Sequence, residues 1–394
     1  LLLGSIGYFL YTFLFLICTI FGSCQWILYP LASCILGLSS GLLWIAQGRY
    51  YSRNSLLYSD VTTSSISQCN IKLAAIFALI FLFIEAIMRL LSTSILLLTI
   101  TTKQLSTYYL MFSFIILSYN VIIISMFIPF HSLSSLYEEG TNNFSLSLSS
   151  FTSPLYTLWH VFAKDERTSL LLPYQFAFGL TATFFQLFVF GYVFSGEDGA
   201  IEESKRGGAG FDIGSFDMSV LNSFSSDSDE LVREKMLLVM MSALVSITGA
   251  VLSIPFSLIS IQLGKPCLMF LSLSLLALIG VLLLSLSLSS LTEWAVYVPL
   301  LVIFGICRCV WLTTNRAIAA DNYSTHIEPC TAAFSVITGV FILSDALSYL
   351  IYPSLSQTHL SLLLILTSLI ACLAYGISLT IRQYHMNERE RERE

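Results

Sequence analysis

The chain has 394 residues, of which only 11% are charged, a formal net charge of −6 and a mean hydropathy of +0.82. A soluble core of this size does not use so many apolar side chains. The composition excludes a soluble globular protein and predicts an integral multi-pass membrane protein of the plasma membrane or an endomembrane, with the lipid bilayer as its first partner and no nucleic acid.

Ten stretches of about 20 apolar residues follow one another, and this length crosses the hydrocarbon of a bilayer. Because a charge in mid-bilayer is costly, the gaps between charges outline the spans. Long apolar runs, in place of alternating ten-residue segments, favour helices over a closed barrel and predict an all-α polytopic fold. The predicted spans are 1–21, 26–47, 72–99, 107–130, 170–194, 236–261, 267–288, 294–317, 331–352 and 359–381.

Four predicted spans precede the polar segment 131–167 and six follow it. Many transporters consist of two six-helix halves joined by a long cytoplasmic loop. We therefore expect an N-terminal half-bundle at 1–130 that lacks its first two helices, a cytoplasmic loop between the halves at 131–167, a C-terminal six-helix half-bundle at 168–381 and a charged cytoplasmic tail at 382–394. The start inside an apolar run predicts an N-terminally truncated chain.

Lys and Arg collect on the side of the 131–167 loop, which places that side in the cytoplasm and leaves Lys103 as the one base of a short outer loop. The segment 197–235 then lies outside, with ten acidic and four basic residues among Gly and Ser. It is typical of a flexible, solvated linker. A vestibule that concentrates cations, or a segment that binds a partner, is the alternative.

The sequence predicts no enzyme. Its five histidines fall in loops, at span ends or in the tail, whereas a membrane acyltransferase or metalloprotease needs a buried histidine. The nine cysteines are scattered without disulfide or zinc spacing. We expect no catalytic residue, no metal and no cofactor.

Charged residues inside the spans carry the functional argument, because such a charge must be paired, wetted or functional. Glu85 and Arg89 stand four apart on one helix face and can pair directly, as a structural ion pair or as a proton or cation site. Arg308 lies roughly 15 Å from the inner end of its span. It either faces a cavity and holds an anionic group, or anchors to a carbonyl or to Asp345.

Polar uncharged side chains complete the candidate pathway. Gln175 and Asn315, with Asn120 and Gln186, either line a route for a solute or ion or simply join helices by hydrogen bonds. The candidate substrate or ion pathway therefore consists of Arg308, Glu85, Arg89, Asp345, Gln175 and Asn315.

Two motifs resemble a known family. The first is Gly41-Leu-Leu-Trp44-Ile-Ala-Gln47-Gly48, followed after one residue by a tyrosine pair. The second contains Gly305 and Arg308, then Thr-Asn315-Arg316-Ala, then Asp321. They resemble motifs of the fourth and tenth helices in the uncoordinated-ninety-three family, a branch of the major facilitator superfamily. The resemblance implies the major-facilitator fold, with the present spans as helices three to twelve.

Some members of that family regulate potassium channels or escort membrane receptors, and others are regarded as solute transporters. Two hypotheses follow: an alternating-access, solute-carrier-like transporter of unknown substrate, and a non-transporting regulatory subunit or trafficking adaptor for a channel or receptor. This chain has Leu312 where many relatives have an acid, so an ion site implied by the resemblance would lack the nearest candidate partner of Arg308.

The motifs also have purely physical interpretations. Gly41 and Gly48 permit close helix packing, and Trp44 is expected near a membrane interface. The sequence Leu263-Gly-Lys265 is expected to form a tight turn.

Overall fold

The computed structural model describes residues 2–20, 25–102, 113–122, 148–186, 242–287, 290–291, 293–323 and 327–391. These residues are almost entirely helical, and no strand occurs among them. The acidic segment 197–235 lies outside the described residues, as does most of the predicted 107–130 span beyond the helix at 113–122.

A helix occupies the described part of every predicted span. The helices are α1 (Leu2–Ile20), α2 (Gln25–Thr62), α3 (Ile66–Thr102), the unlabelled helix Ser113–Ile122, α7 (Leu172–Phe184), α11 (Ala243–Gln262), α12 (Lys265–Ser285), α14 (Trp294–Val310), α16 (Ile327–Ile351) and α17 (Gln357–Arg391). A π-helical stretch, η4 (Trp311–Asn315), and a short helix, α15 (Arg316–Asn322), continue α14 without a break.

Seven helices of the described residues are long and apolar enough to cross a bilayer. Their outward faces are apolar too: Leu38, Val251, Leu350 and Leu373 are each at least 65% exposed. A soluble protein rarely exposes so much apolar side chain, and helices satisfy their own backbone groups in lipid. The chain is therefore an all-α membrane protein.

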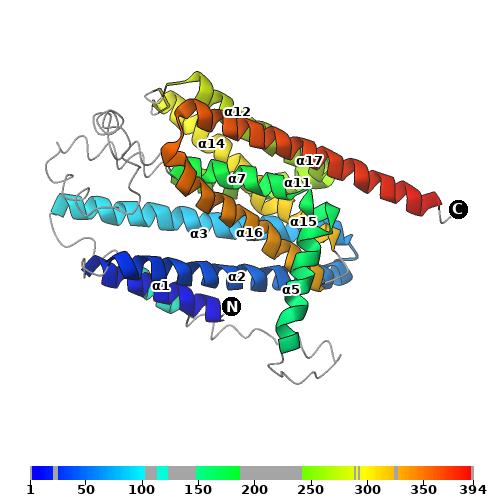
Figure 1. The fold of residues 1–394 in the computed structure, drawn as a ribbon, viewed down its shortest axis with the longest axis horizontal. Helices are drawn as coiled ribbons and strands as arrows, with labels where there is room; N and C mark the ends of the chain where they lie inside the picture. Colours follow the sequence, from blue (N-terminus) through cyan, green and yellow to red (C-terminus); the bar gives the residue numbers. More distant parts are fainter. Residues whose placement is uncertain are drawn as a thin grey trace.

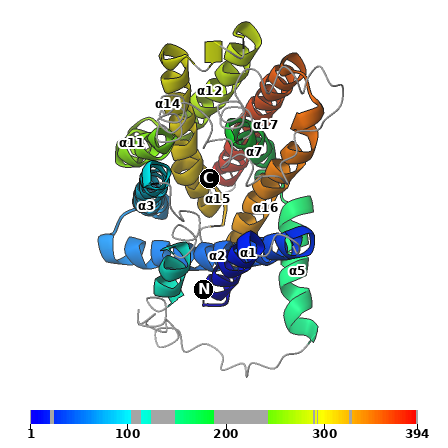
Figure 2. The ribbon, with the colours of Figure 1, turned by 90° about the vertical axis from the view of Figure 1, so that its left-hand side faces the viewer.

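Most of the helices run roughly lengthwise through the molecule, with α16 and α17 inclined to α2 and α3 (Figure 1). The main core joins α7, α11, α12, α14 and α17, and α3 reaches it through Ala78 and Leu82. Viewed along the bundle, α3 lies beside α11, and α2 passes the end of α16 (Figure 2). The N-terminal segment thus meets the C-terminal segment mainly along α3 and α2.

Helices extend past the predicted span ends. The helix α2 continues through Arg53 to Thr62, and only 63–65 separate it from α3, with Thr63 at a φ of 52°. The expected polar break between 47 and 72 is therefore mostly helix. Charged residues are excluded from the bilayer core but are tolerated in a helix. The positions of charges therefore mark the limits of the hydrocarbon region rather than the ends of the helices.

The loop expected at 131–167 is also partly helical. It contains α5 (Leu148–Ala163), which crosses the bundle direction, and the short α6 (Glu166–Ser169) (Figure 1). The tail expected at 382–394 continues α17 as far as Arg391 and projects beyond the bundle (Figure 1). Glu and Arg are strong helix formers, which explains why this charged run extends the helix.

The two glycines of the first motif differ in how closely a described helix packs against them. A Cβ added to Gly48 would lie 3.0 Å from Phe334 Cβ, so α2 and α16 do approach closely there. Gly41 has no described atom within 4 Å of that position, so no described helix packs closely against it. The expected tight turn after α11 is confirmed, because Gly264 adopts a φ of +88°.

Gly305 sets the approach of α14 to α11. A Cβ on Gly305 would lie 2.8 Å from the carbonyl oxygen of Val245 and 2.8 Å from Thr248 Cβ. We expect Gly305→Ala to cost about 1–3 kcal/mol, because a backbone carbonyl cannot rotate away. Thermal unfolding of the purified protein in detergent measures this as a lower midpoint.

Gly41→Ala is the matched control for this prediction. Alanine is the better helix former and meets open space there, so the midpoint should stay or rise, by up to about 1 kcal/mol of stability. An unchanged midpoint for Gly305→Ala would contradict the packing argument.

Candidate functional site

Polar side chains line the contact between α3 and the continuous rod formed by α14, η4 and α15, which we call the seam. The two run antiparallel: Glu85 lies opposite Arg308, Phe77 opposite Arg316 and Asn70 opposite Asp321. The first two levels are separated by roughly 12 Å of helical rise, and the second and third by roughly 8–10 Å. The seam therefore has three levels, which are described in turn.

The first level is an ion-paired triad. Arg308 grips both carboxylate oxygens of Glu85, with Nη1 2.8 Å from Oε1 and Nη2 2.5 Å from Oε2. Arg89 donates through Nε to Oε1 of the same carboxylate at 2.9 Å. Bidentate arginine–carboxylate pairs are among the strongest polar contacts in proteins. One acid thus serves two bases, which leaves the triad with a charge of +1.

Ser246 of α11 and Ser242, the residue before that helix, complete this level. Ser246 accepts a hydrogen bond from Arg308 Nη1 at 3.4 Å, and Ser242 accepts one from Arg89 Nη1 at 3.3 Å. The side chains of Glu85 and Arg308 are about one-fifth exposed, and that of Arg89 is 35% exposed. The triad is paired but not sealed.

The predicted pairing of Glu85 with Arg89 is confirmed. The two partners considered for Arg308 are both wrong, because its charge partner is Glu85. Asp345 instead accepts a hydrogen bond from Thr183 on α7. Glu85, Arg89 and Arg308 are the charges deepest in their predicted spans, but no sequence pattern shows which spans become neighbours.

The middle level is a buried arginine among aromatic rings. Arg316 is 5% exposed, and its guanidinium carbon lies 4.4 Å from the ring centre of Trp44, 5.1 Å from Phe77 and 5.3 Å from Trp311. Its Nη1 and Nη2 have no hydrogen-bond partner among the described residues. Burying an unpaired charge costs several kcal/mol, and cation–π contacts return only about 2 kcal/mol.

The π-helical stretch explains how Trp311 serves two neighbours. Trp311 donates through Nε1 to Gln175 Oε1 at 2.7 Å, and Gln175 donates through Nε2 to Asn315 Oδ1 at 2.8 Å. The wider π turn also sets Trp311 against Arg316, five residues on. Asn315 Nδ2 and Thr314 Oγ1 are buried without a described partner. Four buried polar atoms of residues 314–316 therefore have no described partner.

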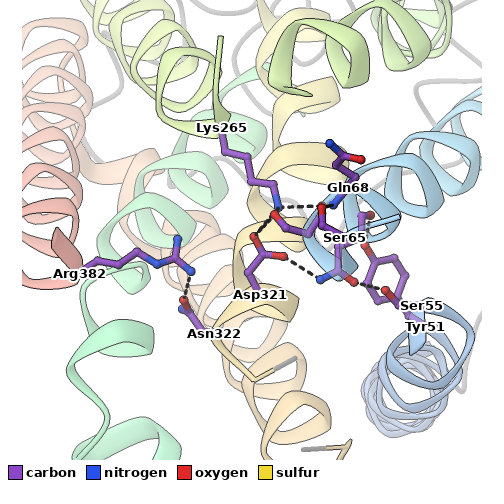
Figure 3. A network of polar contacts seen from close by, with 10 residues as sticks. Tyr51, Ser55, Ser65, Gln68, Lys265, Asp321, Asn322 and Arg382 are labelled. Atoms are coloured by element: carbon purple, nitrogen blue, oxygen red, sulfur yellow. Dashed lines mark hydrogen bonds and ion pairs between the residues drawn. The ribbon is translucent and has the colours of Figure 1, made fainter. Parts of the chain in front are cut away.

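The third level is a network around Asp321 (Figure 3). Its carboxylate accepts from Lys265 at 2.5 Å, from Ser67 at 2.8 Å and from Asn70 at 2.7 Å. Lys265 also donates to the hydroxyl and the carbonyl of Ser67. Asn70 accepts in turn from Ser55, so the network ties α2, α3, α12 and α15 together.

A cavity of about 260 Å³ opens beside this network, and its lining includes Lys265, Asp321, Arg382 and Ser260. Arg382 reaches across from α17 and donates to Asn322 Oδ1 at 3.2 Å (Figure 3). The cavity lies at the end of the bundle, away from Glu85 and Arg308.

Tyr323 connects the same end to α6 and the residue before it. Its hydroxyl donates to Asp165 and lies 2.7 Å from Thr168 Oγ1. Burial, and then the hydrogen bond to Asp165, raise the pKa of Tyr323. The tyrosine therefore stays neutral and remains a donor across the physiological pH range.

The structure brings the predicted site residues into two groups. Glu85, Arg89 and Arg308 form the triad, and Gln175 and Asn315 meet below it. Trp44 contacts the guanidinium of Arg316. Gln47 is half-buried on α2. Residues that sequence reasoning missed are Phe77, Asn70, Ser67 and Trp311.

Gln186 and Asn120, the remaining pathway candidates, make local contacts. Tyr349 donates to Gln186, which joins α16 to the end of α7, and Asn120 donates to the carbonyl of Ile116 in its own helix at 2.9 Å. Both fit hydrogen bonding within and between helices.

Among the described residues, no three His, Cys, Asp or Glu side chains gather as a metal site. Comparison with family models, with curated proteins and with solved structures gives no match.

Proposed function

We propose that this chain is a major-facilitator-like membrane transporter of the uncoordinated-ninety-three type, in which two halves rock against each other along the seam. The observation that carries the proposal is the ion pair of Glu85 with Arg308. Each charge comes from a different half of the predicted architecture, and both lie deep within spans. A charge at that depth is expensive and marks a solute or ion pathway in many transporters.

The contacts along the seam suit a moving interface. They are discrete ion pairs and hydrogen bonds, which water or a solute can replace one by one when the halves part. Asp321 and Lys265 would close the cytoplasmic end in the predicted orientation, while the Glu85 level lies deeper. The described conformation corresponds, on this proposal, to the state closed at the Asp321 end.

Cysteine labelling in membrane vesicles tests this movement. Ser246 is fully buried against Arg308 at the seam, whereas Ser272 is equally buried inside the C-terminal half, where it contacts Tyr174. We expect a hydrophilic maleimide to modify Ser246→Cys over time and to leave Ser272→Cys unmodified, as read by peptide mass spectrometry. A transporter exposes its seam to water in each cycle, but not the interior of one half.

A regulatory or adaptor protein is the second candidate, and one observation favours it: all three charges of the triad are satisfied by protein groups. A static seam of this kind would leave Ser246→Cys as unreactive as Ser272→Cys. That outcome would reject the transporter and favour the adaptor, which would bind a channel or receptor through its outer helices.

A further inference from the structure

We infer that Arg316 is the anchor of a binding site for a small organic carboxylate, closed within the seam in the described conformation. The inference deepens the proposed transporter function by naming a solute class, and it rests on that function for the way in. The observations that carry it are the unpaired guanidinium nitrogens and the aromatic rings around them.

The two arginines of the rod differ in one respect. Arg308 meets α3 at Glu85 and is neutralised by it, while Arg316, eight residues further on, meets α3 at Phe77. An arginine keeps its charge under all physiological conditions. The described structure therefore pairs Arg308 with a carboxylate, whereas the corresponding position opposite Arg316 is occupied by an aromatic ring.

The chemistry of the missing partner follows from the donors. The planar guanidinium fork matches a planar carboxylate with two parallel hydrogen bonds. Nη1 and Nη2 are both unused among the described residues. Unused donors on this scale call for a ligand with acceptor oxygens, and an anion also balances the charge.

The surroundings select the rest of the ligand. Trp44 and Phe77 come from the N-terminal half, and Trp311 comes from the C-terminal half. Their rings would pack against an apolar or aromatic body and would exclude the hydration that a small inorganic anion keeps. The π-helical stretch that positions Trp311 is a feature often found at functional sites. A monocarboxylate with an apolar body fits these features.

Access requires the halves to part. Asn315 is completely buried and Arg316 nearly so, and their neighbours belong to both sides of the seam. Separation of α2 and α3 from the rod would uncover the guanidinium and the three rings together. A carboxylate bound there would bridge both halves when they close again.

Ligand-dependent thermal shifts of the purified full chain in detergent test the inference. The probes are phenylacetate, its neutral isostere phenylacetamide, decanoate and inorganic phosphate. We expect saturable stabilisation by phenylacetate and none by phenylacetamide or phosphate. If decanoate stabilises the protein at far lower concentrations than phenylacetate does, the same carboxylate site takes long-chain acids that enter from the bilayer. Equal shifts with phenylacetamide or phosphate would overturn the inference.

Two variants connect the binding to Arg316. Arg316→Met removes an unpaired charge, so the ligand-free protein should unfold at the same or a higher temperature while the shift by phenylacetate disappears. Arg316→Lys keeps the charge but loses the fork, and it should weaken phenylacetate at least about tenfold. Arg382→Gln, at the outer cavity, is the control that should bind as the parent does. A phenylacetate shift that survives in both Arg316 variants would overturn the site.

Labelling of Ser246→Cys separates this inference from the proposed function. If Ser246→Cys is labelled and no carboxylate binds, the solute class is wrong and the transporter proposal stands. If phenylacetate binds through Arg316 but Ser246→Cys is never labelled, the carboxylate site stands and the transporter proposal fails.

Discussion

Glu85→Gln should destabilise the protein more than any other single change in the triad, by about 3 kcal/mol. Glutamine leaves both Arg308 and Arg89 without their shared carboxylate, and an unpaired charge within a span is costly. The effect is below that of a fully buried pair because these side chains are one-fifth to one-third exposed. Thermal unfolding in detergent, followed by the retained monodisperse fraction, measures it.

Arg308→Met provides the comparison. It leaves Glu85 paired with Arg89, so the loss should be only about 1–2 kcal/mol. The double variant should lose less stability than the sum of the two single-variant losses, because both changes act on one contact. Equal losses for Glu85→Gln and Arg308→Met, or strict additivity, would show that the carboxylate does not hold the two arginines together.

Asp321→Asn is expected to have the second largest effect, about 2 kcal/mol. Asparagine retains the shape but turns one acceptor oxygen into a donor, which then faces Lys265, Ser67 or Asn70. The carboxylate is only 9% exposed, so water cannot fully replace it. The same change should speed labelling of Ser246→Cys, since the network of Asp321 closes this end of the seam.

Lys265→Met is the matched control for this end. It leaves Asp321 with two hydrogen bonds, from Ser67 and Asn70, and so should cost less than Asp321→Asn. If Lys265→Met proves the more damaging of the two, the ammonium rather than the carboxylate organises the network. If neither variant alters labelling at Ser246→Cys, the network does not control the seam.

The seam shows how far charge positions alone can predict a site. Glu85, Arg89 and Arg308 stand out in the sequence because each interrupts an apolar run, and the pairing within one helix follows from a spacing of four residues. The pairing of Glu85 with Arg308 joins positions 223 residues apart, and no local pattern encodes which helices become neighbours. The sequence therefore identified the charged side chains but offered the wrong partners for Arg308.

The middle level was less visible. Arg316 belongs to a sequence motif, but Phe77 and Trp311 are ordinary apolar residues of their spans. The π-helical stretch has no recognisable sequence pattern. Only the packing of α2, α3 and the rod places three rings around one guanidinium. The unpaired state of its nitrogens is likewise a property of the whole arrangement, since it depends on which groups fail to come near.

The sequence by itself determined that this protein is helical and lies in a membrane, because apolar runs of that length are stable only in lipid and only as helices there. It also located the turn at Gly264 and the spans themselves. Tertiary structure alone decided where helices end, that residues 148–163 form a helix, and which polar groups meet across the seam. Lipid selects for hydrophobicity, which is a local property, whereas hydrogen bonds and ion pairs between spans depend on the relative placement of helices that are distant in the chain.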